Sequence, residues 1–163
     1  RNIIFFCYCA LMIFESLSEL TESLTPGARL LGLDVGSKTV GMAVSDSEFK
    51  IATAIDTIRR TKFTQDFEQL KEIIADRNIG GLVIGLPISM DGTEGPACQS
   101  IRQFGTNITD RMETGIAFWD ERLSTSAVQR FLTDEADMTR KRRSEVVDKL
   151  AATYILQGAL DSL

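Results

Sequence analysis

Two short apolar runs, at residues 30–35 (LLGLDV) and 82–86 (LVIGL), constrain the fold of this chain more than any other feature. Runs without polar alternation are typical of strands that are buried on both faces, as in parallel sheets covered by helices. Between the two runs, apolar residues recur at helical spacing from about residue 64. A helix between two buried strands indicates an α/β domain with helices on both faces of its sheet.

The remaining elements follow from the same kinds of pattern. Residues 39–44 alternate directly after the first run and predict a hairpin with it. Further strands are expected at 51–58 and 116–119, and further helices at 97–113, from 124 or 125 to 131, and at 145–160. The predicted order is β-β-β-α-β-α-β-α-α, a mixed sheet of five strands in which three antiparallel strands precede parallel βα units.

The length of 163 residues suits one domain. We expect this domain to occupy residues 29–163, and residues 1–28 to form an extension that is poorly ordered or partly translated from upstream of the true start, with Met12 as the initiator. The apolar run at 3–14 is shorter than the ~20 residues that span a bilayer. We therefore favour upstream translation, with no membrane association, over the alternative that this run is a genuine anchor.

The chemistry open to this chain is limited by the absence of histidine. Ser-His and Cys-His pairs and imidazole metal ligands are excluded, so catalysis would depend on carboxylates, Lys, Tyr, Cys or bound water. The three cysteines, at positions 7, 9 and 98, form no disulfide framework. Such cysteine usage fits a reducing compartment, and we expect the protein to be cytoplasmic.

Acidic residues occur where a purely structural core would not place them. Asp34 lies inside the first apolar run, Asp120 and Glu121 close the strand at 116–119, and Asp148 lies in the last helix. Strand ends of an open α/β sheet line a crevice, where these carboxylates could meet. Carboxylate oxygens are the ligands of Mg²⁺ and Mn²⁺, and a pair of such ions can cleave phosphodiester bonds.

Each of these features also has a simpler structural interpretation. An Asp at a strand end is often a turn or cap residue, and the GSKT that follows Asp34 could simply be a hairpin turn. Asp148 could be an exposed helix residue paired with the arginines at 140–143. The basic run TRKRR could be a solvated face.

Four segments, LLGLDVGSKTVGMAVSD, GLPISMDGT, WDERLST and VVDKLAATYILQGAL, together resemble the YqgF/RuvX family over residues 29–163. Members of that family are RNase H-like nucleases linked to maturation of the 5′ end of 16S rRNA, and were earlier described as candidate Holliday junction resolvases. The resemblance implies an RNase H-like mixed sheet with a metal-dependent carboxylate site. One departure is Ser89, which stands where the family loop often has Asn in LNMDGT.

Carried over by position, the resemblance assigns roles to individual residues. Asp34, Glu121 and Asp148 would be the catalytic metal ligands, with Asp120 and Asp91 supporting them. Residues near the scissile phosphate would be Ser37, Lys38, Thr39, Arg122, Ser124 and Thr125. From the basic cluster beside Asp148, Arg142 and Arg143 are further candidates for binding the nucleic acid.

The net charge of −5 is unusual for a protein that binds nucleic acid. Without residues 1–28, which carry one Arg and three Glu, 17 basic and 20 acidic residues remain. Net charge says little about local fields, and basic residues gather at 140–143 and 149 on either side of Asp148. A basic rim around an acidic centre predicts that the affinity for nucleic acid falls steeply as the salt concentration rises.

The sequence therefore predicts a cytoplasmic, Mg²⁺- or Mn²⁺-dependent endonuclease that acts on precursor 16S rRNA as a monomer or weak homodimer. One alternative is a Holliday junction resolvase that cleaves branched DNA from a symmetric dimer with the same site. A second is a non-catalytic RNA-binding assembly factor. A third, an ATPase with an actin- or hexokinase-type phosphate loop, needs two such domains, and this chain has room for one.

Overall fold

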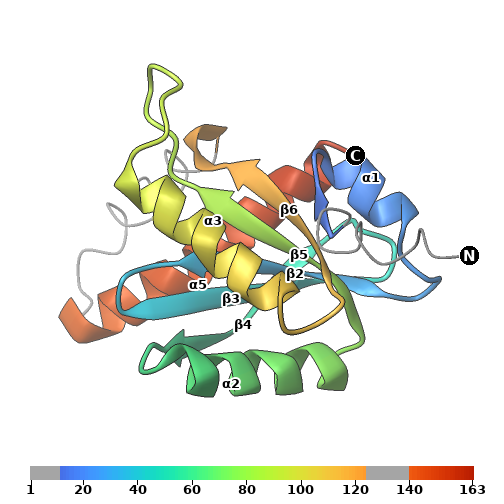
Figure 1. The fold of residues 1–163 in the computed structure, drawn as a ribbon, viewed down its shortest axis with the longest axis horizontal. Coiled ribbons are helices and arrows are strands. Elements are labelled where there is room, and N and C mark those ends of the chain that lie inside the picture. The colour runs from blue at the N-terminus through green and yellow to red at the C-terminus, as the bar shows by residue number, and fades with distance from the viewer. Residues whose placement is uncertain (1–11, 124–139) are drawn as a thin grey trace, which may run out of the picture.

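The computed structural model describes residues 12–123 and 140–163, which form a mixed sheet of six strands between two layers of helices (Figure 1). The strand order is β1-β6-β5-β2-β3-β4. The elements, in chain order, are β1 (Ile13–Phe14), α1 (Leu17–Glu22), β2 (Arg29–Val35), β3 (Thr39–Ser45), β4 (Ala52–Arg59), α2 (Phe63–Asp76), β5 (Ile79–Leu86), α3 (Pro96–Thr109), β6 (Gly115–Asp120), the 3₁₀ turn η1 (Glu121–Leu123) and α5 (Arg140–Asp161).

The arrangement of the central strands confirms the predicted mixed sheet. Strands β2 and β3 form the antiparallel hairpin, and β4 pairs antiparallel with β3. Strands β5 and β6 then join β2 in parallel. Each parallel step has a helix between its strands, α2 before β5 and α3 before β6, which is the βα pattern expected from the sequence.

Helices cover both faces of the sheet because its strands alternate between two apolar clusters. Leu31 and Leu33 of β2 belong to the cluster under α2 and α3, whereas Leu30 belongs to the cluster under α1 and α5. Gly32 lets α5 approach closely, since a Cβ there would lie 2.7 Å from Cβ of Leu156. Helices α2 and α3 therefore cover one face of the sheet, and the long helix α5, with the short α1 beside it, covers the other (Figure 1).

The sheet has six strands and not the expected five, because residues before 29 contribute one. β1 pairs in parallel with β6, with Ile13 opposite Ile116. Leu17 and Leu20 of α1 are buried, and Ser16 caps that helix by accepting a hydrogen bond from the Glu19 N–H at 3.2 Å. Where it is described, this stretch is therefore part of the domain and not a poorly ordered extension.

Two other expectations concern the C-terminal part of the chain. Helix α5 begins at Arg140, earlier than the expected residue 145, so the basic run belongs to its first turns. The helix expected from 124 or 125 to 131 lies outside the described residues. In the portion that the structure describes, no helix is long and apolar enough to cross a membrane.

Candidate active site

Asp34 and Glu121 come from different strands and meet on the face of the sheet that α5 covers. Asp34 is the penultimate residue of β2, and Glu121 follows directly after β6. Strand β5 lies between them: Leu33 pairs with Ile84, and Gly85 pairs with Trp119. Because side chains alternate along a strand, positions 34, 85 and 121 all point toward α5.

Gly85 provides the space in which the Glu121 carboxyl lies. A Cβ at position 85 would lie 2.5 Å from Oε1 of Glu121 and 2.6 Å from Cδ1 of Ile155 on α5. The carboxyl group therefore rests on the backbone of β5, between the sheet and the helix. A glycine inside a buried strand is a sequence signal of such a close approach, and Gly85 was missed as a site residue.

The surroundings of Glu121 disfavour its charged form. Burial, followed by the negative charges of Asp34 and Asp120, raises the pKa of this carboxyl to about 7. A carboxyl that is desolvated and close to a second carboxylate is typical of a functional site. A divalent cation would compensate both charges, and an all-oxygen donor set of this kind suits Mg²⁺ or Mn²⁺.

Asp148 lies on α5, and the described contacts of that helix show which way it runs. Leu160, near its C-terminal end, belongs to the same cluster as Leu17 of α1, at the end of the sheet where β5 and β6 begin. The N-terminal half of α5 therefore extends toward Asp34. The carbonyl of Ala152, four residues after position 148, lies 3.2 Å from the Cβ position of Gly32.

The side chain of Asp148 lies outside what the structure describes, so convergence of the three carboxylates stays a prediction. Among the described residues there is no group of three Asp, Glu, Cys or His side chains that could hold a metal ion. The described part of the candidate site is thus the pair Asp34 and Glu121.

Arg60 stabilises the turn between β2 and β3 by hydrogen bonds, a role that the sequence did not predict. The Arg60 N–H donates to the carbonyl of Lys38 at 2.8 Å, and its Nη1 donates to the carbonyl of Gly36 at 2.6 Å. Its guanidinium also lies 5.5 Å from the ring centre of Phe104. The Gly36 carbonyl is thus bonded to the guanidinium and the Lys38 carbonyl to the main-chain N–H of Arg60, while Ser37 and Lys38 are exposed to solvent.

Asp120 and Arg122 form a tight pair beside Glu121. The guanidinium donates to Oδ2 of Asp120 from Nε at 2.8 Å and from Nη2 at 2.6 Å. The same hydrogen bonds lower the pKa of Asp120 and raise that of Arg122. Asp120 is therefore ionised and engaged with Arg122, an arrangement that suits a supporting residue better than a direct metal ligand.

The loop after β5 (residues 87–95) closes a tight turn at SMDGT. The Ser89 N–H donates to the carbonyl of Thr93 at 3.0 Å, and the Gly92 N–H to that of Ser89 at 2.8 Å. The Thr93 hydroxyl donates to Asp91 at 2.7 Å and is the main cause of that carboxyl's lowered pKa, to which the charge of Arg122 also contributes. Because Ser89 acts through its main chain, the departure from LNMDGT leaves the turn intact.

The remaining predicted phosphate contacts are only partly described. Thr39 begins β3 next to the turn held by Arg60. Ser124 and Thr125 lie outside the described residues. Arg142 and Arg143 belong to the first turns of α5, and their side chains are not described.

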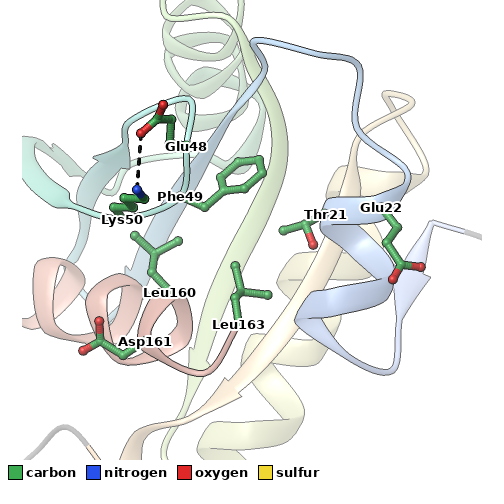
Figure 2. Close-up of a pocket in the computed structure, with 8 residues that line it drawn as sticks. All are labelled: Thr21, Glu22, Glu48, Phe49, Lys50, Leu160, Asp161 and Leu163. Carbon is green, nitrogen blue, oxygen red and sulfur yellow. Dashed lines mark ion pairs between the residues drawn. The ribbon is translucent and has the colours of Figure 1, made fainter.

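A separate hollow of about 550 Å³ lies at the opposite end of the sheet (Figure 2). It is bounded by α1, by the turn between β3 and β4, and by the C-terminal end of α5, with Phe49 and Leu160 among its lining residues. Its charged side chains are Glu22, Asp161 and the ion pair of Lys50 with Glu48 at 3.6 Å. The hollow is open and mostly acidic, which does not favour a phosphate ligand.

The raised pKa of Glu121 predicts how the stability of the metal-free protein depends on pH. The folded state holds a proton on this group up to about pH 7, whereas the ordinary value is 4.5. The folded state therefore binds more protons in that window, and the free energy of unfolding falls as the pH rises through it. In Glu121→Gln this fall is absent, so at pH 8 the variant is expected to be more stable than the unsubstituted protein by roughly 1–2 kcal/mol after allowance for partial solvent exposure.

Urea unfolding in the presence of a chelator at pH 4, 6 and 8 measures this difference. Glu68→Gln, which neutralises an exposed carboxyl on α2, is the control and should follow the unsubstituted protein at each pH. Parallel curves for Glu121→Gln and the unsubstituted protein would contradict the prediction.

Comparison with known proteins identifies relatives along most of the chain. The family model described as "RuvX: Holliday junction resolvase" matches residues 28–162. A protein of Rhodospirillum centenum is 57% identical over 157 residues, covering 93% of this chain and 83% of the relative. One of Paramagnetospirillum magneticum is 61% identical over 145 residues, covering 89% and 93%. Both carry the name "Putative pre-16S rRNA nuclease".

Solved structures of much lower sequence identity share the fold. T. thermophilus RuvC in complex with a Holliday junction substrate matches with a TM-score of 0.53 and 12% identity, over 83% of this chain and 94% of that one. The Fowlpox virus resolvase bound to Holliday junction DNA matches with a TM-score of 0.50 and 11% identity, over 82% and 97%. These likenesses confirm the expected RNase H-like fold.

Proposed function

The chain belongs to the RuvX family, and from this premise we propose that it is a divalent-metal-dependent endonuclease that processes the 5′ end of precursor 16S rRNA. The observation that carries the proposal is the pair of carboxylates, Asp34 and Glu121, gathered over Gly85 with the pKa of Glu121 raised to about 7. A divalent cation would compensate the negative charge that this pair carries when Glu121 is ionised. On this proposal the protein acts in the cytoplasm, where precursor ribosomes are processed.

On this proposal, each residue of the site has a separate role in phosphodiester cleavage. Asp34 and Glu121, together with Asp148, would hold the ion. A bound divalent ion activates water and stabilises the charge that develops on the phosphate oxygens. Lys38 and Ser37, on the exposed turn that Arg60 holds, would receive the substrate phosphate. Asp120 fixes Arg122 at the rim of the site, where its charge attracts the nucleic acid backbone.

The choice of RNA over DNA follows the name that the two relatives carry, "Putative pre-16S rRNA nuclease". Branched DNA is the second candidate, because the family description and the two solved neighbours name Holliday junctions. A junction resolvase cuts two strands symmetrically and needs paired sites. We propose a monomer or weak dimer, in which a single site is sufficient for RNA.

The test is a cleavage assay with purified protein on a precursor 16S rRNA fragment and on a four-way DNA junction, with Mn²⁺, with Mg²⁺ and with a chelator. We expect cleavage of the RNA that requires a metal and is abolished by the chelator. Preferential cleavage of the junction by a dimer would favour the resolvase. Metal-independent RNA binding without cleavage would identify the protein as an assembly factor instead.

A further inference from the structure

Met90 lies at the tip of the loop after β5 and is 89% exposed, more than the other large apolar side chains that the structure describes as exposed, Ile51 at 64% and Leu163 at 50%. The loop stands out from the body of the domain, next to the end of β6 (Figure 1). Isolated exposed apolar residues are common on protein surfaces. The position of Met90 is informative because of how its loop is held and what lies beside it.

Both arms of the loop are fastened to the domain. On the first arm, the Ile88 N–H donates to the carbonyl of Leu86 at 2.9 Å, and Ile88 packs against the core. On the second arm, Glu94 accepts a hydrogen bond from Nε of Arg102 at 3.0 Å, and Arg102 lies 4.9 Å from the ring centre of Phe118 on β6. Together with the closed turn at its tip, these contacts keep Met90 in place without covering it.

The loop leaves the sheet at the edge that carries the candidate active site. Leu86, the last residue of β5, pairs with Asp120. Asp91, the neighbour of Met90, lies within the electrostatic range of Arg122. On the proposed function, a nucleic acid strand with a phosphate at Asp34 and Glu121 would have this loop beside it at the same edge of the sheet.

The charges of the loop indicate which part of such a strand it meets. Residues 87–95 contain Asp91 and Glu94 and no Lys or Arg. Glu94 is paired with Arg102, so the negative charge near the tip is mainly that of Asp91. A carboxylate repels a phosphate backbone, so the tip suits the uncharged bases. A methionine thioether is flexible and polarizable, packs well against aromatic rings, and is among the apolar side chains that wedge between bases.

We propose that Met90 packs against a nucleobase of the bound substrate and thereby selects strands whose bases are unstacked near the cut site. This inference rests on the proposed nuclease function and deepens it. Met90 takes no part in the chemistry at Asp34 and Glu121. Its contribution is to the binding of substrate with an accessible base.

The experiment compares Met90→Ala and Met90→Phe with Ile51→Ala, which truncates another exposed apolar side chain at the start of β4, away from the site. Cleavage of a single-stranded RNA containing the processing site is followed over a range of RNA concentrations with Mn²⁺. Loss of one thioether–ring contact is expected to raise the half-saturating RNA concentration of Met90→Ala about 2- to 12-fold. The cleavage rate at saturating RNA should change less than the half-saturating concentration. Met90→Phe should bind RNA about as well as the unsubstituted protein, because phenylalanine can also pack against a base.

Two further readouts separate the inference from the proposed function. The salt dependence of RNA binding keeps its slope in Met90→Ala, because no phosphate contact is lost. A fluorescent adenine analogue next to the cut site changes its emission on binding to the unsubstituted protein and not on binding to Met90→Ala. Both can be measured with a chelator present, so they test Met90 even if cleavage fails. Equal RNA affinity and equal emission for Met90→Ala and Ile51→Ala would overturn the inference.

Discussion

Replacement of Asp34 by Asn is expected to lower RNA cleavage by about 10³-fold or more while the fold is retained. An amide is a neutral and weaker ligand for a hard cation than a carboxylate, so ion binding and the charge balance of the site are both lost. The substitution preserves size, and Asp34 is only partly buried, so little packing changes. Loss of its negative charge also lets the pKa of Glu121 fall toward the ordinary range.

The control for Asp34→Asn is Asp56→Asn, which removes one exposed carboxylate from the edge strand β4 and should leave cleavage unchanged. Trp119, the only tryptophan of the chain, pairs with Gly85 and reports on the site directly. Mn²⁺ should quench its fluorescence in the unsubstituted protein and in Asp56→Asn, and much less in Asp34→Asn. Cleavage by Asp34→Asn at the rate of the unsubstituted protein would refute the role assigned to Asp34.

Replacement of Gly85 by Ala is expected to reduce cleavage by about 10²-fold and stability by roughly 1–3 kcal/mol, the range for overpacked cores. The added methyl group would lie 2.5 Å from the Glu121 carboxyl and 2.6 Å from Cδ1 of Ile155, so both must move. Displacement of Glu121 separates it from Asp34. The control is Gly95→Ala before α3, where a Cβ meets nothing within 4 Å.

A second substitution separates the effect of the contact with Glu121 from that of the contact with Ile155. Valine lacks the Cδ1 atom of isoleucine, so Ile155→Val in the Gly85→Ala background should recover part of the stability and none of the cleavage. Thermal unfolding and the RNA assay measure the two effects. Recovery of cleavage in the double variant would show that Gly85 serves helix packing and not the placement of Glu121.

The sequence predicted those parts of the fold that depend on local pattern. The buried strands β2 and β5, the hairpin and the long helices follow from runs and periodicities that neighbouring residues share. Strand β1 could not be predicted, because Ile13–Phe14 forms a strand only by pairing with β6, about a hundred positions later. The packing of Leu20 over Gly81 and Gly115 is likewise a long-range contact that no local pattern encodes.

The candidate site was predictable to a similar extent. Asp34 and Glu121 could be proposed because acids at strand ends are chemically conspicuous, and in the structure burial and then the charge of Asp34 raise the pKa of Glu121. Arg60 was not identified, since an arginine at the end of an edge strand has no distinctive pattern. Its role arises from hydrogen bonds to Gly36 and Lys38, more than twenty residues away, which only the folded chain brings within reach.

The position of α5 links the burial of the apolar face to the protonation of the candidate site. This helix covers the face of the sheet toward which Asp34 and Glu121 point. If α5 moved away from the sheet, Leu30, Ala43 and Val83 would be open to water, and Glu121 would lose the burial that is the main cause of its raised pKa. Any local opening of this helix should therefore hydrate the apolar face and release the proton of Glu121 in a single event.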